Sequence, residues 1–126
     1  MDTRPPPVPF AERVLAVSSP NDLLGLHREA IETNLKAVQP LDEQYQAAMD
    51  QSQRGTAITI GRQIEGLTAQ LVRNTGAVQA RIVELFPTAE AAVQASELIA
   101  DPKEKTGFIS LWAHAKAEHD QAQNRR

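Results

Sequence analysis

The chain has no cysteine and few aromatic residues, and both absences narrow what it can be. Without cysteine it has no disulfides, no thiol nucleophile and no cysteine-ligated zinc site. Aromatic residues make up 4% of its 126 residues, so the core must be mostly aliphatic. No apolar run approaches the roughly 18 residues that cross a bilayer, and the N-terminus lacks a signal-peptide pattern. We therefore expect a cytoplasmic protein without a membrane segment.

The chain also has little net charge and no recognisable catalytic constellation. A formal charge of −3 provides no basic field for a polyanion, so we expect no direct binding to nucleic acid. His27 lies beside an apolar helix face, which is typical of an interfacial histidine rather than a catalytic one. His114 and Glu118 are four residues apart and could share a metal, but two ligands without a third favour an ion pair. We expect a non-enzymatic protein with no metal, no cofactor and no catalytic residue.

Helix-forming residues dominate what is present, and the most regular pattern lies between residues 59 and 86. Its apolar positions recur every three or four residues, which is the heptad-like seam of a long helix. The pattern predicts a helix over about 56–86 that packs on a second helix and supports a homodimer. The predicted seam comprises Ile60, Ile64, Leu67, Leu71, Asn74, Val78, Ile82 and Leu85.

A second long helix is predicted over about 20–53. Ser19 is suited to the N-cap, Pro20 to the first helical position and Asp22 to the acidic third position. Pro40 deletes one hydrogen bond of this helix, so we expect a kink or a short break there.

The two long helices are separated by a turn at residues 53–56, where Gly55 suits a left-handed position. A short turn makes them antiparallel. The predicted fold is therefore all-α: a long antiparallel hairpin (about 20–53 and 56–86) followed by two short helices (about 89–100 and 107–121). Residues 1–9 are expected to form a Pro-rich extended arm, and residues 10–126 a single helical domain.

Two details of the central helix allow alternative interpretations. Gly61, Gly66 and Gly76 could relieve crowding where another helix crosses, or could loosen the helix for a partner. Residues 60–68 could also form the first helix and turn of a helix-turn-helix. Because the apolar seam continues through that supposed turn, a continuous helix is favoured.

The hairpin resembles the TraM antiactivators between about Ser19 and Pro87. In the first helix the matching residues are Pro20, Asp22, Leu23, Ala30, Ile31, Thr33, Val38, Asp42, Glu43, Gln46 and Ala47, and Tyr45 stands where the family has phenylalanine. The second helix is similar at Ile64, Glu65, Ala69, Gln70, Leu71, Asn74, Thr75, Phe86 and Pro87. Pro40 and the long segment after Pro87 depart from the family's pattern.

Proteins of that family are small helical dimers that bind LuxR-type quorum-sensing activators of conjugal transfer and prevent them from binding DNA. The resemblance implies the same antiactivator function here. The candidate partner-binding residues are Tyr45, Gln46, Arg62, Gln63, Gln70, Arg73 and Trp112. Two other functions stay open: a structural coat or assembly protein, such as a phasin-like granule protein or a phage-particle component, and a helix-turn-helix DNA-binding regulator.

Overall fold

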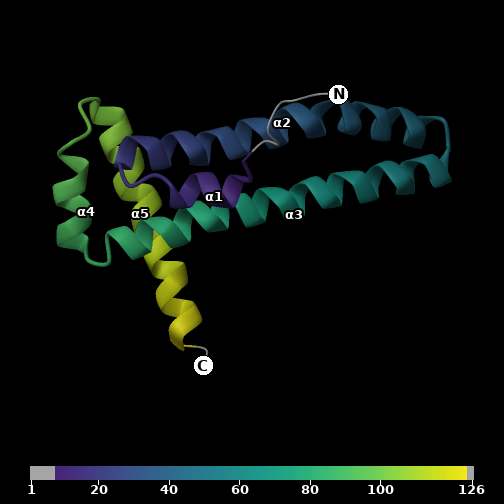
Figure 1. Ribbon diagram of the computed structural model, residues 1–126. Helices are drawn as coiled ribbons and strands as arrows, with labels where there is room; N and C mark the ends of the chain where they lie inside the picture. Colours follow the sequence, from purple (N-terminus) through teal and green to yellow (C-terminus); the bar gives the residue numbers. More distant parts are fainter. Residues whose placement is uncertain (1–7, 125–126) are drawn as a thin grey trace, which may run out of the picture. The chain divides into compact units, whose positions relative to one another are not determined.

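The computed structural model describes residues 8–124, which form five helices and no strand (Figure 1). The predicted all-α fold is confirmed, and two long helices pack together as a hairpin. Most of the predicted Pro-rich arm, residues 1–7, lies outside the described part. The helices are α1 (Phe10–Leu15), α2 (Pro20–Asp50), α3 (Arg54–Leu85), α4 (Ala89–Ser96) and α5 (Pro102–Asn124).

The start of α2 is the predicted one. The backbone N–H of Asp22 donates a hydrogen bond of 3.1 Å to Ser19 Oγ, and Pro20 is the first helical residue. The expected break at Pro40 is wrong, because α2 continues through it to Asp50. Pro40 is exposed, so water can satisfy the carbonyl that loses its intrahelical donor.

The turn between α2 and α3 places its left-handed residue at Ser52, and the expectation for Gly55 is wrong. Ser52 has a φ of 58°, while Gly55 lies within α3 and has no positive φ. The N–H of Gln53 donates to the carbonyl of Ala48 (2.8 Å), and that of Ser52 to the carbonyl of Met49 (3.1 Å). This pair of bonds is a Schellman motif, which satisfies the last carbonyls of α2.

The described residues group into two compact units, and parts of α2 and α3 belong to each. The first unit contains the described residues up to Leu26 and from Ala77 onward; the second is His27–Gly76. No helix in the described part of the chain is long and apolar enough to cross a membrane.

The first unit contains the well-packed core. One cluster joins α1, α2 and α3 through Val14, Leu23, Leu26, Val78 and Ile82. A second cluster joins α4 and α5 through Ala92, Ala95, Ile99 and Phe108.

The start of α5 is held against the end of α3 by aromatic contacts. Trp112 Nε1 donates a hydrogen bond of 2.6 Å to the carbonyl of Phe86. The rings of Phe86 and Phe108 meet edge to face at 5.5 Å. Phe108 is fully buried, so it cannot serve as an exposed anchor for another molecule. Trp112 therefore packs α5 onto the end of α3.

Helix α4 is shorter than expected and presents a different face to the core. It ends at Ser96 rather than near residue 100. Val93 and Leu98 are 52% and 75% exposed. Ala92, Ala95 and Ile99 are buried instead, because small alanines let α4 approach Phe108 closely.

In the second unit, α2 and α3 form the outer part of the hairpin, and few of its residues are buried. They are Ala30, Ala48, Ala57 and Ile60. Most of these are alanines, so the two helices alone enclose little apolar volume.

The predicted seam packs largely within the chain. Ile60, Val78 and Ile82 are buried, and Val78 and Ile82 belong to the core of the first unit. Those three side chains are therefore unavailable to a second chain in this conformation. The other seam residues are partly buried: Ile64, Leu67, Leu71, Asn74 and Leu85.

The glycines of α3 do not relieve crowding within the chain. A Cβ added at Gly66 or Gly76 would meet no atom within 4 Å, and one at Gly61 would lie 3.9 Å from the Tyr45 ring. Helix α3 is also continuous through residues 60–68, so the helix-turn-helix interpretation of that segment is wrong.

Candidate functional site

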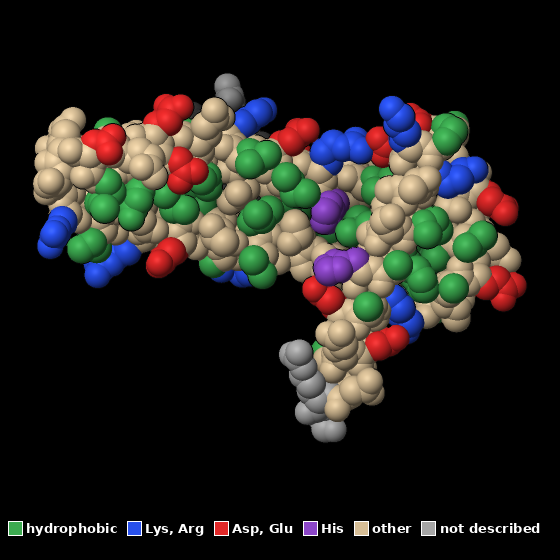
Figure 2. Space-filling view, turned by 180° about the vertical axis from the view of Figure 1, so that it is seen from behind, with side chains coloured by type: hydrophobic (Ala, Val, Ile, Leu, Met, Phe, Trp, Pro, Cys, Tyr) green, Lys and Arg blue, Asp and Glu red, His purple; other side chains and the backbone are tan. Residues whose placement is uncertain are grey.

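The most unusual surface of the second unit is an apolar strip that follows the hairpin. Every large apolar side chain that this unit strongly exposes lies on one side of the helix pair. The strip, here called the hairpin face, comprises Ile31, Leu35, Val38, Tyr45 and Met49 of α2 with Ile58 and Val72 of α3. Leu35 is 60% exposed and Val72 is 63% exposed. Hydrophobic side chains indeed run along the hairpin in the view from behind (Figure 2).

Helix geometry explains why these residues share one side. The α2 members follow one another at steps of four, three, seven and four residues, so they form one stripe. Tyr45, Met49 and Ile58 line the same groove, which places Ile58 on the side of that stripe. Val72 is fourteen residues, close to four turns, after Ile58 and therefore lies on the same side.

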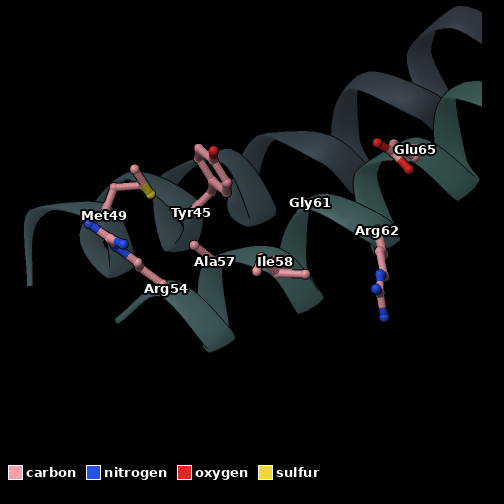
Figure 3. A pocket seen from close by; sticks show the side chains of 8 residues that line it. All are labelled: Tyr45, Met49, Arg54, Ala57, Ile58, Gly61, Arg62 and Glu65. Atoms are coloured by element: carbon pink, nitrogen blue, oxygen red, sulfur yellow. The ribbon is translucent and has the colours of Figure 1, made fainter. Parts of the chain in front are cut away.

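The hairpin face is hollowed near the turn. A groove of about 600 Å³ lies between Tyr45 and Met49 of α2 and the first three turns of α3. Figure 3 shows Tyr45 and Met49 above Ala57 and Ile58, which form its apolar floor. Its charged rim consists of Arg54, Arg62 and Glu65. Arg62 extends away from α2, so its guanidinium is open to a partner at the edge (Figure 3).

The two helices that border this face carry opposite charge. Within residues 27–50, α2 has two basic and five acidic residues, a net of −3. Within residues 54–76, α3 has three basic and one acidic residue, a net of +2. A molecule lying along the groove would therefore meet a negative potential on one side and a positive one on the other.

The opposite side of the hairpin is polar. Thr33, Asn34, Gln70 and Asn74 help to line a small cavity of about 40 Å³ there. Asn34 Nδ2 donates a hydrogen bond of 3.1 Å to the carbonyl of Leu67. A specific bond of this kind fixes how the two helices are aligned, as polar seam residues do in coiled coils.

Metal chemistry has little support among the described residues, where no three potential ligands cluster. His114 Nε2 lies 3.1 Å from Glu118 Oε1, and both side chains are more than half exposed. The two side chains are therefore in contact, as the spacing predicts. The hydrogen bond from Lys116 lowers the pKa of the Asp120 carboxyl, with a smaller contribution from His119. These contacts form a solvated helix end rather than a site.

Only two of the predicted partner-binding residues meet at the groove, Tyr45 and Arg62. Gln70 lines the polar cavity on the other side, and Gln63 lies seven residues before it on that same side. Gln46 and Arg73 are exposed outside the groove. Trp112 belongs to the core of the first unit.

The groove residues Met49, Arg54 and Ile58 are not among the site residues predicted from the sequence. A signal was available: the apolar residues of α2 are too many for one narrow seam. They form two adjacent stripes, of which one packs on α3 and the other is exposed.

Comparison of the chain with protein-family models, with curated proteins and with solved structures gives no match.

Proposed function

We propose that the chain is a non-enzymatic antiactivator in the cytoplasm. Its second unit binds a LuxR-type transcriptional activator through the hairpin face and blocks the activator's DNA binding. One observation carries the protein-binding part of this proposal. The hairpin face exposes several large apolar side chains on one side of the helix pair, although a monomer gains nothing from leaving such side chains open to water. Restraint of conjugal transfer would follow from removal of its activator.

The choice of partner rests on the resemblance of residues 19–87 to the TraM antiactivators. Charge supports the same choice. The outer side of α2 carries exposed carboxylates, including Glu32, Asp42 and Glu43, that can face a basic DNA-reading surface. Among the candidate contacts, Tyr45 belongs to the hairpin face and Arg62 lies at the rim of its groove.

The test is to mix the purified chain with a LuxR-type activator from the same source. We expect light scattering to give the mass of a discrete complex, and a mobility-shift assay to show the activator leaving its DNA. An unrelated DNA-binding protein serves as the control and should stay bound. Persistence of the activator–DNA complex at saturating chain would refute the antiactivator function.

A structural coat protein is the second candidate, because apolar side chains are also exposed outside the hairpin. Val93 and Leu98 near α4 would give such a protein a further adsorbing surface. A coat protein should form large assemblies or adsorb to apolar particles, whereas an antiactivator should form one defined complex. Sedimentation with polyhydroxyalkanoate granules distinguishes the two.

A further inference from the structure

We infer that the hairpin face is a docking site for one amphipathic helix of a partner protein, about five turns long, with an acidic and a basic edge. The inference deepens the proposed function, and rests on its protein-binding part only. It names the element that the hairpin captures, whichever protein supplies that element.

The shape of the surface favours a helix as occupant. Two antiparallel helices leave a straight groove between them, and a third helix fills such a groove with apolar residues at i, i+3, i+4 and i+7. From Ile31 to Met49 the strip follows α2 for eighteen residues, about 27 Å at roughly 1.5 Å per residue. A partner helix of about 18 residues would cover this length.

The packing of the hairpin leaves room for a third helix. Three of the four side chains that the second unit fully buries are alanines, while five of its large apolar side chains, Ile31, Leu35, Met49, Ile58 and Val72, are exposed on the strip. Leu35, Met49, Ile58 and Val72 are each about half exposed or more, so a further helix could pack over them. A helix placed over them converts the pair into a three-helix arrangement with an interior of ordinary composition.

The groove near the turn would be the anchor position. Its volume of about 600 Å³ and its floor of Ala57 and Ile58 suit one or two large apolar side chains. Tyr45 and Met49 form one wall, and methionine adapts its shape to different anchors.

The charges decide what flanks the partner's apolar stripe. Its acidic edge would lie along α3 beside Arg54 and Arg62, and its basic edge along α2 beside Glu32 and Glu43. Among the described residues, neither arginine is in an ion pair within the chain, so both can pair with a partner. Reversing the direction of the docked helix exchanges the two edges, so this arrangement selects one orientation.

A displayed library of helical peptides tests the inference. Each peptide spans about 18 residues, with stripe positions randomised between Leu and Ser and edge positions between Glu and Lys. Selection on the full chain should enrich Leu along the stripe, Glu along one edge and Lys along the other. The best peptide should bind the variant Leu35→Ser about tenfold more weakly. Leu98 lies outside the hairpin and is even more exposed than Leu35, so the variant Leu98→Ser is the control and should bind the peptide as the wild type does.

Three outcomes would overturn the inference. The first is selection without an enriched stripe, and the second is equal binding to Leu35→Ser. The third is a light-scattering mass showing that the wild type is a dimer which Leu35→Ser separates, because a second copy would then cover the face.

The inference and the proposed function can fail separately. If a peptide binds in a way that depends on Leu35 but the activator does not bind the chain, the docking site is supported and the antiactivator function is refuted. If the activator complex still forms with Leu35→Ser, the antiactivator function is supported and the docking site is refuted.

Discussion

At the scale of single residues, the hairpin turn shows how one backbone position limits the side chain it can carry. Ser52 has a left-handed φ of 58°, a conformation that costs most L-residues about 1 kcal/mol and glycine almost nothing. The two hydrogen bonds of the turn, from Gln53 and Ser52, hold this conformation in place. Ser52 is exposed, so its side chain adds little packing in return.

Ser52→Gly should therefore increase the free energy of unfolding by roughly 0.5–1 kcal/mol, measured by urea denaturation. The gain is reduced because glycine also makes the unfolded chain more flexible. Ser52→Ala, which keeps a Cβ, is the control and should not stabilise. A lower urea midpoint for the glycine variant would contradict this assignment of the turn.

At the scale of helices, Arg81 explains how the short helix α1 is held on α3. Its Nε and Nη2 atoms each donate a hydrogen bond of 3.3 Å, to the carbonyls of Val17 and Leu15. Leu15 is the last residue of α1, and Val17 follows it by two residues. A helix of six residues is not stable by itself, so these hydrogen bonds help to hold it in place. Arg81 also pairs with Glu84 at 2.8 Å, but Glu84 is 65% exposed.

Arg81→Met should lower stability by about 1–2 kcal/mol, because it keeps the aliphatic stem but leaves two carbonyls without their charged donor. Hydrogen exchange should accelerate at residues 10–17. Glu84→Gln, which removes only the exposed ion pair, should change stability by less than about 0.5 kcal/mol. Equal effects of the two substitutions would show that Arg81 acts through Glu84 rather than through α1.

At the scale of the whole molecule, the two units differ in how much they bury. The largest fully buried side chains, including Phe108, Leu23 and Ile82, all belong to the first unit. The second unit buries three alanines and Ile60 and leaves its apolar strip exposed. Stability is therefore concentrated in the first unit, and the second exposes the apolar surface that the proposed partner helix would cover.

Native-state hydrogen exchange should show this difference directly. In the free chain, amides of residues 78–85 and 106–112 should exchange slowest, and those of residues 58–72 faster by about tenfold or more. A bound partner helix should slow exchange in residues 58–72 selectively. Equal protection of both regions in the free chain would mean that the hairpin face is already covered.

The sequence by itself determined the two long helices and the order of the elements that follow them. Capping at Ser19 and Pro20, the 3.5-residue seam and the proline after Phe86 are local signals, and each depends on neighbours along the chain. The resemblance to an antiactivator family came from the same local patterns, and stays a prediction.

Only the tertiary structure decided which apolar residues are interior. The seam alone does not show whether its partner is another helix of the same chain, because intrachain and interchain packing require the same periodicity. Val78 and Ile82 are buried beside Val14 and Leu23, which shows that this part of the seam packs within the chain. The exposed strip through Leu35 and Met49 became visible only when α3 was found to cover the adjacent stripe of alanines. A helix presents several apolar stripes at nearly equal spacing, and which one remains exposed depends on contacts between residues distant in sequence.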